Sequence, residues 1–123
     1  MYFNFNTISR TNPKDVIEKL ENNHRSMKKA NLNNIAIKED VMLELIEALR
    51  HNSTMEELSI ANTTLSDYAA ANLACALQNN IRLERLNLES NNVSPNTLIK
   101  IFEVSVCIVC LICEKMFCKI YCV

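Results

Sequence analysis

The chain has 123 residues, enough for a single domain, with 49% hydrophobic residues and a formal net charge of −1. This charge balance gives no electrostatic footprint for nucleic acid or an anionic membrane, so neither is expected as a partner. The sequence contains no glycine, which argues against phosphate-cradling loops, and we expect no cofactor.

Residues 1–12 are predicted to be an N-terminal lead-in, because their aromatic residues lack helical partners at the right spacing. Pro13 suits the first turn of a helix, and Asp15 favours the positive end of the helix dipole. The following apolar residues share one face and predict a helix that ends near Asn23: Val16, Ile17 and Leu20.

Short strands and helices are predicted to alternate from there. Strands are expected at residues 28–34, 56–62 and 85–91. Helices are expected at residues 40–51 and 67–79, where apolar residues recur at intervals of three and four. A further helix should begin at Ser94 and Pro95, because a serine N-cap before a proline is a typical helix start.

One stretch, LERLNLESNNV from Leu83 to Val93, has the L-x-x-L-x-L-x-x-N spacing of a leucine-rich repeat. Its apolar positions recur twice upstream at intervals of 28 residues: Leu83, Leu86, Leu88 and Val93; Met55, Leu58, Ile60 and Leu65; Met27, Ala30, Leu32 and Ile37. This period is typical of strand-plus-helix repeats. The sequence therefore predicts an α/β leucine-rich repeat solenoid, a short right-handed horseshoe segment of about three repeats, with parallel strands on one face and helices on the other.

Asparagines are expected to close the turns of this glycine-free chain. Asn91 follows the third strand, whereas the first two copies have Asn34 and Asn62 one residue earlier. Asn52 and Asn80 stand at helix ends, where we expect a cap in the left-handed conformation.

Equivalent residues of neighbouring repeats should lie side by side on the strands. One predicted row is Lys29, Glu57 and Arg85, which alternates in charge, and another is Asn31, Ser59 and Asn87. We expect these outward positions to form a solvated concave face, which is the usual binding surface of solenoids. The candidate partner surface consists of Lys29, Asn31, Asn33, Glu57, Ser59, Arg85, Asn87 and Glu89.

The repeat pattern fails after Phe102, and residues 104–123 are interpreted as a divergent, cysteine-rich apolar tail that follows the repeats of residues 13–103. Zinc binding by these cysteines is disfavoured, because structural zinc sites use two separated C-x-x-C knuckles, and no metal is expected. Membrane anchoring is disfavoured, because the uncharged run 104–113 is shorter than the roughly 20 residues of a spanning helix. The favoured interpretation is an unrelated C-terminus, from an alternative exon or a misassigned gene end, whose apolar residues extend the fourth helix and cover the open end of the solenoid.

No catalytic site is expected, since no Ser/His/Asp set or carboxylate pair has a meaningful spacing. His24 and His51 lie at predicted helix ends, where histidines commonly cap carbonyls. Cys75 lies beside an alanine stripe and is expected to be a small core residue. No signal peptide precedes the cysteines, so we expect reduced thiols and a cytoplasmic location.

Several segments resemble the leucine-rich repeat half of the tropomodulin/leiomodin family: NPKDVIEKLENN, MKKANLNNIAI, EALRHN and LERLNLESNNVS. The most specific pieces are NLNNI (31–35) and LNLESN (86–91), and the resemblance extends from Asn12 to Phe102, about three quarters of the chain. These residues do not separate tropomodulins from leiomodins.

The resemblance implies a cytoskeletal protein that binds actin, caps the pointed end of the filament and organises actin filaments. In this family tropomyosin binding belongs to an N-terminal half that is absent here, and the C-terminal repeats are absent too. The chain therefore resembles a truncated form or fragment, with weak capping or none expected by itself. The alternative is a generic leucine-rich repeat scaffold that binds another protein and does not cap actin.

Overall fold

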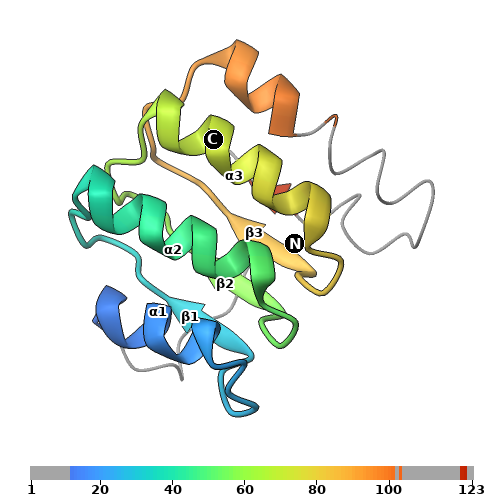
Figure 1. Cartoon of the computed structure of the whole chain (residues 1–123). Coiled ribbons are helices and arrows are strands. Elements are labelled where there is room, and N and C mark those ends of the chain that lie inside the picture. Colours follow the sequence, from blue (N-terminus) through green and yellow to red (C-terminus); the bar gives the residue numbers. More distant parts are fainter. Residues whose placement is uncertain (1–11, 102, 104–119, 122–123) are drawn as a thin grey trace.

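The computed structural model describes residues 12–101, 103, 120 and 121. Helices and strands alternate in this order: α1 (Pro13–Glu21), β1 (Lys29–Asn31), α2 (Glu39–His51), β2 (Glu57–Ser59), α3 (Asp67–Asn79), β3 (Arg85–Asn87), a helical segment at residues 95–101, and β4 (Ile120–Tyr121). The strands form one layer and the helices stack as a second layer beside it (Figure 1). The predicted α/β leucine-rich repeat architecture is confirmed.

The sheet follows chain order, β1-β2-β3-β4, and every pairing is parallel. Lys29 pairs with Glu57 and Glu57 with Arg85, so the first three strands keep the 28-residue spacing of the sequence. In contrast, Leu86 pairs with Ile120, an offset of 34 residues. The fourth strand therefore departs from the repeat, in agreement with the loss of the pattern after residue 102.

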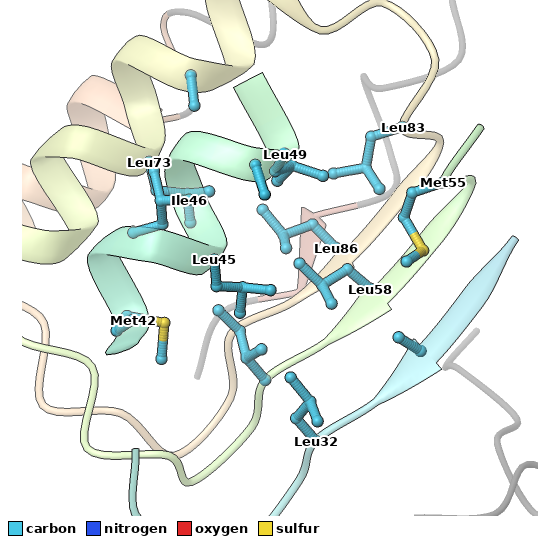
Figure 2. Close-up of a cluster of buried hydrophobic side chains, with 14 of the residues drawn as sticks. Leu32, Met42, Leu45, Ile46, Leu49, Met55, Leu58, Leu73, Leu83 and Leu86 are labelled. Atoms are coloured by element: carbon cyan, nitrogen blue, oxygen red, sulfur yellow. The ribbon is translucent and has the colours of Figure 1, made fainter. Parts of the chain in front are cut away.

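The core lies between the two layers, where each repeat covers the apolar face of the next. Figure 2 shows Leu45 and Leu49 of α2 directed toward the strands that carry Leu58 and Leu86. Of the twelve repeated apolar positions, all are buried except Val93, which is partly buried. The helices contain one further set of buried apolar residues at the same 28-residue interval: Ile17, Leu45, Leu73 and Ile101.

Helices α1 and α3 begin with side-chain caps, whereas the N-cap of α2, Lys38, forms no such hydrogen bond. The Asn12 side chain accepts the backbone N–H of Lys14 at 2.9 Å, and Pro13 follows as the first helical residue of α1. Ser66 caps α3 in the same way through the N–H of Ala69 at 3.1 Å. The strands are shorter than predicted, at three residues each, because the chain turns soon after each strand.

Asn80 joins two repeats through its buried side chain. Its amide donates to the carbonyls of Leu49, at 2.7 Å, and Asn52, at 3.2 Å. Its oxygen accepts the N–H groups of Arg82 and Leu83, both at 2.9 Å. One side chain thus satisfies backbone groups of the α2 end and of the turn before β3, which would otherwise be costly to bury.

Asn52 repeats this arrangement one repeat earlier. Its amide donates to the Leu20 carbonyl at 3.1 Å, and its oxygen accepts the N–H groups of Thr54 and Met55 at 2.9 and 2.7 Å. The expected left-handed caps at Asn52 and Asn80 are wrong, because both residues have extended backbones, with φ of −82° and −105°. Each cap instead donates its backbone N–H to its own helix, at Leu49 or Leu77, while its side chain bonds the end of the preceding helix.

Left-handed residues occur instead at the turns after the strands. Asn34, Asn62 and Ser90 have φ of 64°, 53° and 58°, and they stand 28 residues apart. Asn34 and Asn62 lie in these turns as expected, but their side chains bond each other, with the Asn62 amide donating to the Asn34 oxygen at 3.0 Å, and do not cap the turn backbone as predicted. Asparagine tolerates this conformation better than most residues, which explains how the chain turns without glycine.

We predict that Asn80→Ala destabilises the chain by about 2 kcal/mol, because it leaves buried backbone groups without their partners. Urea denaturation measures the change. Asn79→Ala is the matched control, since Asn79 is exposed and its replacement should cost less than about 0.5 kcal/mol. Equal unfolding midpoints for the two variants would show that the bridge does not stabilise the fold.

A second prediction concerns β4, which covers the outer edge of β3. A chain ending at residue 119 should expose the backbone groups of that edge and self-associate more than the full chain, as free strand edges do. Sedimentation velocity over a concentration series measures this change. A chain ending at residue 121 retains β4 and serves as the control, and monomeric behaviour of both shortened chains would contradict the prediction.

Candidate functional site

The charged row on the strand face is an internal ion-pair ladder. Glu57 is only 7% exposed, and its carboxylate lies 3.6 Å from Lys29 Nζ and 3.0 Å from Arg85 Nη1. The structure confirms that these three residues are neighbours, but the expected exposure of Glu57 is wrong. The long side chains on either strand cover the carboxylate, as Lys and Arg stems commonly do.

The uncharged row is also used within the fold. Ser59 is fully buried and donates its hydroxyl to the Asn33 oxygen at 2.6 Å. The Asn33 oxygen also accepts the Ala61 N–H at 2.8 Å. Asn87 is 8% exposed, and its oxygen accepts the Glu89 N–H at 3.0 Å. Ser59 and Asn87 are therefore not the solvated residues that the sequence predicted.

Five of the eight predicted surface residues keep some exposure: Lys29, Asn31, Asn33, Arg85 and Glu89. Asn31 accepts the N–H of Asn33 at 2.9 Å, so its side chain is held in one orientation. The strand face thus presents fixed polar groups. Such a face suits recognition of another protein and supplies no group poised for covalent chemistry.

The structure brings together a serine and a histidine that the sequence analysis did not pair. Ser26 Oγ lies 2.7 Å from His24 Nδ1, and the same nitrogen accepts the Ser26 N–H at 3.3 Å. His24 stands 28 residues before Asn52, whose side chain accepts the N–H two residues on in the same way. The repeat interval is the signal that identifies this pair as a turn cap and not as a catalytic dyad.

A second polar group lies on the exposed side of α2. Glu47 contacts Arg50 Nε at 3.0 Å and His51 Nε2 at 3.2 Å. The hydrogen bond from Arg50 lowers the pKa of the Glu47 carboxyl, with a smaller opposing effect of desolvation. His51 thus contacts a carboxylate and not the expected backbone carbonyl. This is an ordinary helix-surface ion pair, since its partners lie three and four residues apart.

Cys75 is exposed, which contradicts its predicted place in the core. Cys75 lies on the side of α3 that faces away from the core, although its neighbours in sequence are buried. The buried residues of α3 are Ala69, Ala70, Leu73, Ala74, Ala76 and Leu77. The cysteines of the tail, at 107, 110, 113, 118 and 122, and the apolar run 104–113 lie outside the described residues.

Two properties of the described residues bear on metal and membrane binding. No group of three or more His, Cys, Asp or Glu side chains in the described part of the chain is placed to hold a metal ion. None of the described helices is long and apolar enough to cross a membrane.

A surface depression of about 440 Å³ beside α1 is lined by polar and charged residues: Asp15, Glu18, Lys19, Asn22 and His24.

Comparison with known protein families and sequences shows which proteins the chain is similar to. Residues 9–116 match the family described as the TMOD/LMOD leucine-rich domain. The chain is 32% identical to Rattus norvegicus leiomodin-1 over 88 residues, 34% identical to Rattus norvegicus leiomodin-2 over 90 residues, and 31% identical to Homo sapiens tropomodulin-4 over 94 residues. These matches cover 71%, 72% and 76% of the chain but only 15%, 16% and 27% of the relatives.

Solved structures agree with the sequence relatives. The leiomodin-1 actin-binding site 2 superimposes with a TM-score of 0.73 at 27% identity, covering 80% of this chain and 57% of that one. The Caenorhabditis elegans tropomodulin C-terminal domain superimposes with a TM-score of 0.75 at 26% identity, covering 91% and 62%. The chain therefore belongs to the tropomodulin/leiomodin family of leucine-rich repeat domains.

Proposed function

We propose that this chain binds actin through the surface of its leucine-rich repeats. The observation that carries the proposal is the similarity to the leiomodin-1 actin-binding site 2, which extends over 80% of the chain. The family match over residues 9–116 includes the repeats and their strand residues, which supports a surface of the same kind in this chain. A cytoskeletal location follows from this partner.

The rigidity of the strand face supports a role in protein binding. Asn33, Ser59 and Glu57 are engaged in hydrogen bonds or ion pairs within the fold. Side chains that are already ordered lose little conformational entropy when a partner docks. In this proposal the partly exposed residues Lys29 and Arg85 contact actin, and the buried residues of the predicted surface position them.

Pointed-end capping is the more specific activity proposed for the chain. It requires contacts that block subunit exchange at a filament end, and the chain spans only 27% of the length of tropomodulin-4. We therefore expect the chain alone to bind actin with little capping. The competing proposal is a leucine-rich repeat scaffold for a different protein, which the polar strand face would also suit.

We predict saturable binding of the purified chain to polymerisation-blocked actin monomers, measured by fluorescence anisotropy. Depolymerisation of pyrene-labelled actin filaments with blocked barbed ends should slow only slightly at micromolar chain concentrations, because the match covers only 27% of tropomodulin-4. A complete tropomodulin is the positive control in both assays. Absence of monomer binding at micromolar concentrations would reject the actin proposal and leave the scaffold.

A further inference from the structure

The turns that lead into β1, β2 and β3 lie together at one edge of the sheet, because these strands are parallel and in register. The Lys28 carbonyl accepts the Glu56 N–H at 2.8 Å, and the Glu56 carbonyl accepts the Glu84 N–H at 2.7 Å. We name this edge the basic edge, after its five cations: Arg25, Lys28, Lys29, Arg82 and Arg85. The edge carries three carboxylates at neighbouring positions: Glu56, Glu57 and Glu84.

The carboxylates of the second repeat are already paired with cations of this edge. Glu56 contacts the Arg82 guanidinium. Glu57 lies between Lys29, at 3.6 Å, and Arg85, at 3.0 Å. Neither glutamate is therefore available to neutralise a further cation.

The remaining cations are Arg25 and Lys28, in the turn before β1. Both are exposed, and neither forms an ion pair with any residue that the structure describes. The corresponding residues of the second repeat are Ser53 and Glu56, so the repeat pattern itself does not require positive charge here. A pair of exposed cations without partners leaves this end of the sheet positively charged.

The helix layer has the opposite charge. Besides the helical segment at residues 95–101, which contains Lys100, the layer consists of α1, α2 and α3, which carry eight carboxylates, at Asp15, Glu18, Glu21, Glu39, Asp40, Glu44, Glu47 and Asp67. Together with the α2 cap they carry four cations, at Lys14, Lys19, Lys38 and Arg50. The net charge of −1 thus conceals a separation of charge between the two sides of the chain. An acidic partner would be repelled by the helix layer and attracted to the basic edge.

The same edge exposes one large apolar side chain. Ile81 is 56% exposed and occupies the repeat position of Arg25 and Ser53. Ile81 therefore lies two repeats along the row from Arg25. The edge therefore offers an apolar side chain as well as two cations to a partner.

We propose that the basic edge binds an acidic segment of a protein partner, with Arg25 and Lys28 contacting its carboxylates and Ile81 contacting an apolar residue within it. The identity of that partner as actin rests on the proposed function. A protein segment is favoured over an anionic membrane, because the partly exposed residues Glu56 and Glu84 interrupt the positive surface.

The test uses substitutions that copy the second repeat into the first, so that the fold already accommodates them. Arg25→Ser with Lys28→Glu reproduces Ser53 and Glu56 and removes the unpaired cations. We expect this double variant to weaken binding of polymerisation-blocked actin monomers about tenfold at low ionic strength and to flatten the dependence on salt. Ile81→Ser, which also copies Ser53, should weaken binding by a smaller factor without changing the salt dependence.

The matched control changes the net charge of the chain by the same amount, but near the helix layer instead of at the basic edge. Lys14→Ser with Lys38→Glu alters exposed residues near the helix layer and should change the affinity less than about twofold. Equal losses for the two double variants would show a dependence on net charge alone and would overturn the inference. Unchanged actin affinity of the Arg25 and Lys28 variant would also overturn it, while leaving the proposed actin binding intact.

A second probe separates failure of the inference from failure of the proposed function. If the wild-type chain does not bind actin, a fluorescein-labelled decaglutamate peptide tests the edge directly. Peptide binding that is lost in the Arg25 and Lys28 variant and retained in the control supports an acidic protein partner other than actin. Binding to phosphatidylserine vesicles in place of the peptide, or to neither, overturns the inference.

Discussion

No repeat of this chain can bury its apolar face alone, and the 28-residue interval is what allows each repeat to cover the next. Leu58 and Leu86 stand at that interval and pair in register across β2 and β3. Leu45 and Leu73 keep the interval on the helices, so both layers advance by the same step. A one-residue slip in either layer would turn apolar side chains away from the core. The register therefore determines the core, the strand face and the order of the turns together.

Because the chain contains no glycine, asparagine residues occupy turn positions where glycine is usual. Asn34 and Asn62 adopt the left-handed conformation after the strands, where glycine would be the usual choice. Asn52 and Asn80 act differently, because their buried side chains connect the end of one helix to the turn before the strand of the following repeat. Asn91 extends the same principle by accepting the N–H groups of two residues in the preceding repeat, both at 3.0 Å. Side-chain amides thus add to the backbone hydrogen bonds and ion pairs that join neighbouring repeats.

The surface divides into a polar strand face, a basic edge and an acidic helix layer. Ion pairs between neighbouring strands neutralise most of the charge on the strand face, as the ladder of Lys29, Glu57 and Arg85 shows. Exposed ion pairs contribute little stability, but Glu57 is buried and would be costly to leave unpaired. The unpaired cations of the basic edge, Arg25 and Lys28, lie in the turn before β1, which has one neighbouring strand in the described sheet instead of two.

The sequence by itself determined the repeat interval, the alternation of strands and helices, and the strand register, since each depends on apolar residues that recur along the chain. It also indicated the family, through the repeat residues that match tropomodulins and leiomodins. The bounds of α3 were predicted correctly from the same periodicity.

Only the tertiary structure decided how polar residues are used. Glu57 and Ser59 looked like surface residues because they alternate with core positions, but side chains of the adjacent strands cover them. Cys75 looked like a core residue from its alanine neighbours, but the helix rotation places it outside. Burial and ion pairing of polar groups depend on neighbours that are distant in sequence, and a periodic pattern of apolar residues carries no information about those neighbours.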